Sequence, residues 1–382
     1  MKNRAKTDVL IVGGGPVGLY LAGTLGSAGH SVTILEARNQ IDQHSKSLGI
    51  HPVSLELFEK LGISSRFTEK GIKIQKGRAY VDRNWIGTVD FSRCKKPFNY
   101  ILALPQNRTE EILEHWVTHL DSVSLIRGAV VNGISQSEDF VEVTYQKEDL
   151  QHTIRSLYTV GCDGKNSAVR EITGIRFTGK PYPDTYVMGD YPDTTNFGTE
   201  AAVYLHKNGL IESFPLPNKM RRWVVKTPSY IKQNQKQMLE EFIRERIGED
   251  LAGETGRMIS SFGVQHFLAE RFYSGRILLA GDSAHVVSPI GGQGMNLGWI
   301  TAERASKAIQ TCLDKPGRKE VHLKRFSENA IKTAKNVAFR AEINMWLGRK
   351  RTFPFGRNLI ARLIVNTPLQ KFMAGMFTMR RL

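Results

Sequence analysis

Three glycines and one acid near the N-terminus have the types and spacing of a site that binds phosphates. Gly13, Gly15 and Gly18 follow the apolar run "DVLIV" and open the helical pattern "PVGLYLAGTLGSAG", and Glu36 ends the next apolar run, "HSVTILEA". Because glycine has no Cβ, the backbone can turn tightly and a pyrophosphate can approach the N-terminus of the following helix. Glu36 can accept hydrogen bonds from an adenosine ribose and disfavours a 2′-phosphate, which favours FAD or NAD. The alternative is a glycine-rich turn in an unrelated α/β domain.

Two later stretches place an aspartate directly after a buried strand. Asp163 lies in "CDGKNSAVR" (162–170), where an Asp-Gly turn follows "YTVG"; taken alone, such a turn is more often only structural. Asp282 opens the stretch "GDSAHVVSPIGGQGMN" (281–296) after "RILLA", at the strand end where open α/β sheets bind ligands. Three glycines close this stretch before a helix that begins near Met295. They indicate that the backbone comes very close to something flat or charged.

The elements around these motifs predict two interleaved domains of an α/β protein. "DVLIVGGG", the helix after it and "HSVTILEA" form a βαβ unit, which is typical of a Rossmann-like nucleotide-binding domain. Alternating runs around Asn208-Gly209 indicate a hairpin in a β-rich insert. The expected boundaries are 1–70, 100–174 and 267–335 for the discontinuous nucleotide-binding domain, 71–99 and 175–266 for the β-rich substrate domain, and 336–382 for a C-terminal basic amphipathic helical segment.

The composition of the chain indicates its cellular compartment and the kinds of partner that it could bind. The chain has 382 residues and a net charge of +16, which points to anionic substrates, nucleic acid or an anionic membrane surface. Its three cysteines are widely separated and lack metal-ligand spacing, so we expect a reducing compartment, no disulfides and no metal site. The N-terminal apolar run is too short and too glycine-rich for a signal peptide, and no later run could span a bilayer. These features predict a cytoplasmic protein.

Together, the three motifs resemble those of the class A flavoprotein monooxygenases, the group typified by p-hydroxybenzoate hydroxylase. The resemblance covers roughly residues 7 to 330 and implies one FAD bound in an extended form and reduced by NAD(P)H. The flavin itself would do the chemistry, so no catalytic side chain is assigned, and its ring would be surrounded by Pro289, Gly292 and Gly294. The cofactor-binding positions implied by the family motifs are Gly13, Gly15, Gly18, Glu36, Lys46, Gln106, Asp163, Asp282, Pro289, Gly294, Met295 and Asn296.

Two positions depart from the family pattern. Lys46 stands where many members carry an arginine, and Thr301 stands where an aspartate is common. Lysine can still offer a charge to a phosphate, although it lacks the bidentate fork of arginine.

The resemblance implies a monooxygenase that consumes NAD(P)H and molecular oxygen. It would hydroxylate or epoxidise a small lipophilic aromatic or quinone-type substrate through a C4a-hydroperoxyflavin. The alternative is a flavin-dependent reductase or dehydrogenase of the same fold, acting on an isoprenoid or similar lipophilic substrate. A nucleic-acid-binding flavoprotein would explain the charge, but the sequence contains no recognition module, so we expect no nucleic acid partner.

Several residues could serve the substrate or the cofactor, but each also has a structural role that is more common. Packing within the sheet is the commoner role for the four aromatic residues of the insert that could line a pocket, Tyr186, Tyr204, Phe214 and Trp223. Arg221 and Arg222 could bind an anionic substrate, although exposed arginines in a turn are more common. His285 lies beside Asp282, where a structural role is favoured over that of a general base.

Beyond Arg340 the chain is basic and has apolar faces near "RNLIARLIV" and "LQKFMAGMF". One interpretation is contact with an anionic membrane, peripheral at its inner face, that gives access to a lipophilic substrate. The other is a pair of helices whose apolar faces pack on the protein. The sequence leaves both open.

Overall fold

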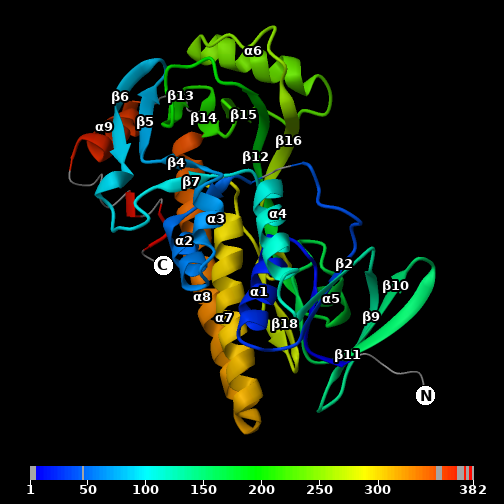
Figure 1. Cartoon of the computed structure of the whole chain (residues 1–382). Helices are drawn as coiled ribbons and strands as arrows, with labels where there is room; N and C mark the ends of the chain where they lie inside the picture. The colour runs from blue at the N-terminus through cyan, green and yellow to red at the C-terminus, as the bar shows by residue number, and fades with distance from the viewer. Residues whose placement is uncertain (1–5, 45–46, 350–354, 368–373, 376–377, 381–382) are drawn as a thin grey trace.

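A computed structural model describes residues 6–44, 47–349, 355–367, 374–375 and 378–380. In this part of the chain the strands form two eight-stranded sheets and one three-stranded sheet. Figure 1 shows the second eight-stranded sheet and helix α6 (Gln235–Ile247) at one end of the molecule, and the first sheet with the long helices at the other. The structure confirms the mixed α/β architecture expected from the sequence.

The first sheet has a parallel centre that explains its long apolar strands. Its order is β17-β18-β11-β1-β2-β8, with parallel pairs from β18 to β8; β10 pairs antiparallel with β11, and β9 pairs antiparallel with β10. Val9, Leu10 and Ile11 in β1 are fully buried, as expected of a strand covered on both faces. The strands are β1 Lys6–Val12, β2 Val32–Glu36, β8 Val123–Arg127, β9 Val130–Gln136, β10 Val141–Lys147, β11 Leu150–Gly161, β17 Tyr273–Ser274 and β18 Ile277–Leu279.

Helices cover this sheet and bring its motifs together. α1 packs against α4 and α7, and α7 packs against α8, so elements from both ends of the chain lie side by side. The helices are α1 Pro16–Ser27, α2 Pro52–Lys60, α3 Ser64–Thr68, α4 Gln106–Val117, α5 Ala168–Ile172, α7 Gln293–Asp314 and α8 Lys319–Gly348, and the 3-10 turns are η2 Gly281–Ser283 and η3 Pro316–Arg318.

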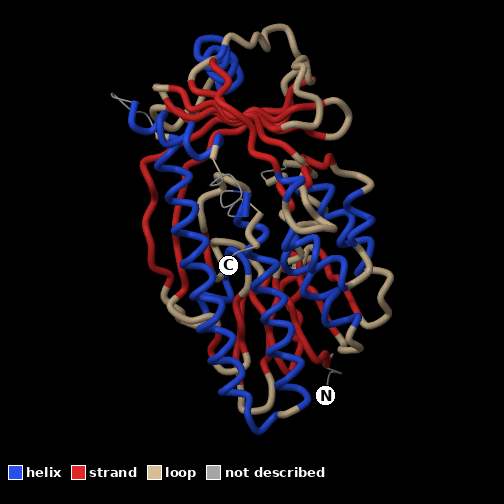
Figure 2. The backbone as a smooth tube through the Cα atoms, turned by 90° about the vertical axis from the view of Figure 1, so that its left-hand side faces the viewer, coloured by secondary structure: helices blue, strands red, loops and turns tan. Residues whose placement is uncertain are grey.

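The second sheet is almost wholly antiparallel and has the order β19-β16-β12-β15-β14-β13-β5-β6. Only the β13–β5 pair is parallel. One face packs against α6, and the other faces the helices of the first part, across whose ends the sheet lies in Figure 2. The strands are β5 Lys76–Val81, β6 Asn84–Asp90, β12 Phe177–Pro192, β13 Ala201–His206, β14 Gly209–Leu216, β15 Met220–Thr227, β16 Arg257–Ala269 and β19 His285–Val286.

A small sheet and a C-terminal helix complete the structure. The sheet has the order β3-β7-β4, from β3 Gly49–Ile50, β7 Ile101–Ala103 and β4 Ile72–Ile74, and β14 packs against it. Helix α9 (Phe355–Asn366) packs on β6, which is followed by the 3-10 turn η1 (Phe91–Arg93). Residue 336, the expected start of the C-terminal segment, lies inside α8.

The two stretches expected to form the β-rich domain, 71–99 and 175–266, contribute strands to one sheet. β5 and β6 from the first stretch lie in the same sheet as the strands β12, β13, β14, β15 and β16. The hairpin at Asn208-Gly209 joins β13 and β14. β19 also pairs with β16, although it comes from the stretch assigned to the nucleotide-binding domain. The domain boundaries themselves remain a prediction.

Candidate functional site

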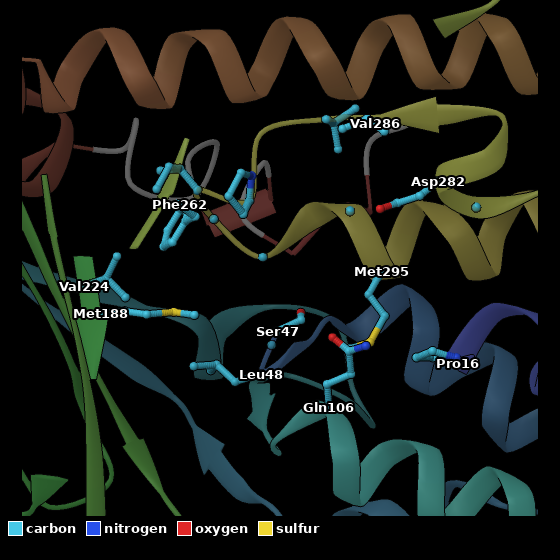
Figure 3. A pocket seen from close by; sticks show the side chains of 18 of the residues that line it. Pro16, Ser47, Leu48, Gln106, Met188, Val224, Phe262, Asp282, Val286 and Met295 are labelled. Carbon is cyan, nitrogen blue, oxygen red and sulfur yellow. The ribbon is translucent and has the colours of Figure 1, made fainter. Parts of the chain in front are cut away.

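A cavity of about 1100 Å³ lies where the first sheet, the N-terminus of α7 and the second sheet meet. Pockets for a single small ligand usually measure roughly 300–1,000 Å³, so this one has room for more than one small molecule. Figure 3 shows Met188, Val224 and Phe262 on the sheet side, and Gln106 and Met295 on the other side. The cavity therefore joins the glycine motifs to the β-rich part.

The three N-terminal glycines have different roles in the structure. Gly13 has φ +105°, and a Cβ there would lie 2.4 Å from the carbonyl oxygen of Cys162. Gly15 also lines the cavity, but a Cβ on it would meet nothing within 4 Å. Gly18 is not among the lining residues; its missing Cβ would lie 1.9 Å from the oxygen of Gly13. The first two are placed where a phosphate would approach, and the third lets α1 pack on β1.

Glu36 lies at the end of β2, where it is buried and borders the cavity. One carboxylate oxygen accepts the N–H of Gly14 at 2.6 Å, and the other accepts the backbone N–H and the Nε–H of Arg38 at 2.9 and 2.8 Å. Burial acts to raise the pKa of Glu36, but the hydrogen bonds from Arg38 and Gly14 outweigh it and lower the pKa. The group is thus ionised, and a carboxylate has capacity for further donors such as ribose hydroxyls.

Asp163 follows the end of β11 and has one oxygen available. Oδ2 accepts the N–H of Val169 at 3.1 Å, whereas Oδ1 is buried and meets no donor from the described residues. Burial raises the pKa of this carboxyl. Buried polar atoms usually have a hydrogen-bond partner, so an unsatisfied oxygen at the cavity wall fits a site that a ligand completes.

The N-terminus of α7 borders the cavity from the far end of the chain. Gly291 and Gly292 have φ values of +85° and +66°, so this turn takes a left-handed conformation that favours glycine. No side chain caps the helix at Gly292, which leaves N–H groups and a partial positive charge at this end. Pro289, Gly292, Gly294 and Met295 line the cavity.

Asn296 supports this turn from behind and is not among the lining residues. Its side-chain oxygen accepts the N–H of His51 and the hydroxyl of Ser54 at 2.8 and 2.7 Å, and its amide donates to the oxygens of Gly49 and Gly292. It therefore ties α7 to the segment 49–54.

Three further residues were expected to bind the cofactor, and the structure describes two of them. Gln106 and Asp282 line the cavity, and the Gln106 amide donates to Glu110 at 2.9 Å. Lys46 lies outside the described residues. Among the residues that are described, no group of His, Cys, Asp or Glu could hold a metal ion.

His285 has the surroundings of a structural residue. It is buried, its Nε2 lies 2.8 Å from the Thr301 hydroxyl, and its ring packs near Phe272. Burial lowers the pKa of His285 to about 4, so the ring is neutral near pH 7. This hydrogen bond also gives Thr301 a role inside the protein.

The sheet side of the cavity is mainly apolar. Of the four aromatic residues considered from the sequence, only Phe214 lines it. Tyr204 and Trp223 pack in the cluster beneath α6, and Tyr186 stacks on Phe262 with ring centroids 5.5 Å apart. Glu212 is the one acid among the described residues of these strands that line the cavity. The sequence argument did not single it out, because its position in β14 resembles any polar position in a strand.

The two arginines expected to be exposed are buried instead, so that expectation was wrong. Arg221 is 0% exposed and pairs with Asp193 at 2.9 Å, and Arg222 is 1% exposed and pairs with Asp190 at 2.6 Å. Their charges are balanced by acids on and just after β12. Each acid compensates the cost of burying the guanidinium that it pairs with.

These features fit the adenosine, phosphate and ring parts of FAD. The turn at Gly13 and Gly15 leaves room for a pyrophosphate beside a helix N-terminus, and the ionised Glu36 lies where a ribose would be bound. Asp163 offers an unsatisfied acceptor, and the uncapped α7 favours negative charge on a flavin ring. The individual cofactor contacts remain predictions.

Comparison with known proteins gives the same cofactor. Residues 6–341 match the family model described as FAD binding domain. The chain is 33% identical over 298 residues to a rifampicin monooxygenase of Streptomyces venezuelae and 34% identical over 301 residues to an uncharacterized aromatic compound monooxygenase of Bacillus subtilis. These matches cover 76% and 77% of this chain but only 61% and 59% of those proteins.

Solved structures agree on the fold. The anhydrotetracycline hydroxylase OxyS of Streptomyces rimosus superimposes with a TM-score of 0.82 at 27% identity, covering 99% of this chain and 76% of that one. A p-nitrophenol 4-monooxygenase of Pseudomonas putida superimposes with a TM-score of 0.90 at 20% identity, covering 99% and 100%. The chain belongs to the FAD binding domain family, which confirms both its resemblance to the class A flavoprotein monooxygenases and FAD as its cofactor.

Proposed function

We propose that this protein is a monooxygenase that uses FAD, NAD(P)H and molecular oxygen to hydroxylate or epoxidise an apolar aromatic or quinone-type molecule. The observation that carries the proposal is that glycine turns and Glu36 border one part of the cavity, and the apolar face of the second sheet borders another part of the same cavity. Bound FAD would supply the transfer of electrons and the activation of oxygen. The relatives are named as monooxygenases of rifampicin, of an aromatic compound and of anhydrotetracycline, and these names favour a monooxygenase over a reductase.

The residues of the chain would position the substrate and exclude water. Met188, Val224 and Phe262 present an apolar surface across the cavity from Met295. Such a surface favours a flat, lipophilic molecule because its burial removes apolar area from water. A cavity closed to bulk water also limits wasteful side reactions of reactive oxygen species.

The test is incorporation of oxygen. The FAD-loaded protein is incubated with NADH or NADPH, ¹⁸O₂ and a panel of phenols, quinones and aromatic polyketides, and products are analysed by mass spectrometry. We expect at least one compound to gain a single ¹⁸O atom and to accelerate NAD(P)H oxidation. A product that gains hydrogen and no ¹⁸O would instead show a reductase.

We further propose that this protein is cytoplasmic and touches an anionic membrane surface through its C-terminal helices, α8 and α9. No helix in the described part combines the length and apolar character needed to cross a membrane. Both helices do pack on the protein: α8 buries Phe326, and α9 buries Ala361 against β6. Their outer faces nevertheless expose large apolar side chains, Phe339 (64%), Trp346 (43%), Leu359 (49%) and Leu363 (50%). The basic character of the tail supports attraction to anionic lipids.

Replacing both Leu359 and Leu363 with serine is expected to reduce the fraction of FAD-loaded protein that floats with phosphatidylglycerol vesicles by about tenfold. Each leucine is about half exposed, so the fold does not depend on it, and loss of two apolar contacts weakens insertion into the interface. Val321→Ser, an exposed apolar position near the other end of α8, is the control. Equal flotation of both variants and the wild type would contradict the membrane proposal.

A further inference from the structure

One carboxyl group on the sheet side of the cavity has no partner within the protein. Glu212 lies on β14 between Leu210 and Phe214, and all three line the cavity as alternate residues of a strand. In the sheet it stands directly opposite Val203 on one side and Val224 on the other. The residue is 8% exposed, and within the described structure it makes no hydrogen bond or ion pair.

The two arginines that line the cavity from the second sheet are already engaged. Arg222, on the neighbouring strand β15, directs two guanidinium nitrogens to Asp190 at 2.6 and 2.8 Å. Arg78, on β5, binds Glu200 at 2.5 Å. These two arginines line the cavity with Glu212, so neither the acid nor an anionic substrate finds an unpaired arginine there among the described residues.

A second polar group near Glu212 also lacks a partner. The hydroxyl of Tyr186 on β12 is buried and meets no hydrogen-bond partner in the described chain, and Lys226, whose ammonium lies 5.8 Å from that ring, pairs with Asp184. Burial, and then the charge of Glu212, raise the pKa of Tyr186, so the phenol stays protonated. Tyr186 is therefore neutral and contributes no charge to the site.

Burial raises the pKa of Glu212 to about 7, because no neighbour stabilises the ionised form. A carboxyl with this pKa can accept and release a proton near neutral pH, as a general base must. Leaving a carboxylate buried and unpaired costs stability, and such groups occur preferentially at functional sites. A ligand that carries a hydrogen-bond donor would supply the partner that Glu212 does not find within the described protein.

We propose that Glu212 is a catalytic base that binds a ring hydroxyl of the aromatic substrate and takes its proton. This inference rests on the proposed function, and it specifies the substrate as a neutral hydroxylated ring whose hydroxyl points toward β14. A ring bearing a carboxylate at that position is excluded by repulsion from Glu212 and by the pairing of both arginines.

The proposed step is a proton transfer only. The O–H bond of the substrate breaks, its proton binds a carboxylate oxygen of Glu212, and the electron pair stays on the substrate oxygen. That pair delocalises into the ring and makes the ortho and para carbons better nucleophiles for the oxygen atom that comes from O₂. The electrons for reducing O₂ come from NAD(P)H, so Glu212 is neither oxidised nor reduced.

The test compares two ligands that differ only in whether the ring oxygen carries a proton or a methyl group. The FAD-loaded protein is titrated with 2-naphthol and with its methyl ether, 2-methoxynaphthalene, at pH 6 and pH 8, and binding is followed by the visible absorbance of the flavin. Naphthol should stay protonated at both values, since phenols resemble tyrosine with a pKa near 10. We expect the wild type to prefer naphthol about tenfold or more at pH 8, where Glu212 is ionised, and clearly less at pH 6.

Glu212→Gln keeps the shape of the side chain and removes its charge. We expect its preference for naphthol to be small and equal at the two pH values, with FAD content unchanged. The matched control is Glu245→Gln, an exposed acid on α6, which should behave as the wild type. Equal binding of the two ligands by the wild type, no binding of naphthol, or a pH-dependent preference that survives in Glu212→Gln would each overturn the inference.

Failure of the proposed function gives a different result. In that case no aromatic compound would gain ¹⁸O, while the pH-dependent preference for naphthol and its loss in Glu212→Gln would persist. Glu212 would then be a recognition residue in an enzyme of another activity. Oxygen incorporation without this preference would leave the function intact and exclude Glu212 as the base.

Discussion

Replacing Gly13 with alanine is expected to abolish FAD binding and to destabilise the fold by at least about 3 kcal/mol. Two costs combine at this position. The φ of +105° is rarely adopted by residues with a side chain, and the new Cβ would lie 2.4 Å from the Cys162 oxygen and 2.9 Å from the Cα of Asp163. All these atoms are backbone at the end of β11, so the strand must move. Urea unfolding of the FAD-free protein and the flavin content after purification measure the two effects.

Gly15→Ala is the matched control, because its new Cβ would meet nothing within 4 Å and its φ of −79° suits any residue. We expect its free energy of unfolding to stay within about 0.5 kcal/mol of the wild type. Its FAD affinity should still fall about tenfold or more, since the added methyl group projects where the phosphates would approach. Wild-type FAD binding in Gly13→Ala would show that the phosphates lie elsewhere.

Glu212→Gln is expected to stabilise the FAD-free protein by up to about 3 kcal/mol at pH 8. The pKa of Glu212 is about 7 in the folded protein against the usual 4.5, and each pH unit corresponds to about 1.4 kcal/mol. Since the folded state holds the proton more tightly, this group favours folding below pH 4.5, and its contribution is lost as the pH rises through 7. Glu212→Gln has no carboxyl to ionise at this position, so its stability does not fall in this way as the pH rises.

Urea unfolding at pH 4.5 and pH 8 measures this effect. Near pH 4.5 the wild type and Glu212→Gln should be almost equally stable, and the gap should open as the pH rises. Glu245→Gln, in which an exposed acid is neutralised, should follow the wild type at both values. A variant that is less stable than the wild type at pH 8 would mean that Glu212 has a stabilising partner.

The parts of the molecule that could be predicted from the sequence depend on neighbours along the chain. Gly13, Gly15 and Glu36 belong to one βαβ unit, so their placement at the end of β1 and β2 follows from local patterns. The same holds for Asp282 after β18 and for the hairpin at Asn208-Gly209. In each case the elements on either side of the motif lie within a few residues of it.

The parts that could not be predicted depend on which strands become neighbours. Arg222 is buried because β15 pairs with β12, which brings Asp190 opposite it across the sheet. Glu212 is unpaired because valines stand on both sides of it. Its alternation with apolar residues is the same for a strand exposed on one face. Glu212 is buried because this face of the sheet lies against the cavity, and the sequence pattern does not show that arrangement.

The order in which the strands occur along the chain has a consequence for synthesis on the ribosome. β11 ends at Gly161, but its neighbour β18 is formed by Ile277–Leu279. Likewise, β5 pairs with β13, which follows it by more than a hundred residues. Neither large sheet can close before the segment around residue 280 has been synthesised. Folding is then a late and largely collective event, dominated by contacts distant in sequence. Until it occurs, the edge of β11 at Thr159–Gly161 lacks its partner strand, and an unpaired strand edge is a site of aggregation in an emerging chain.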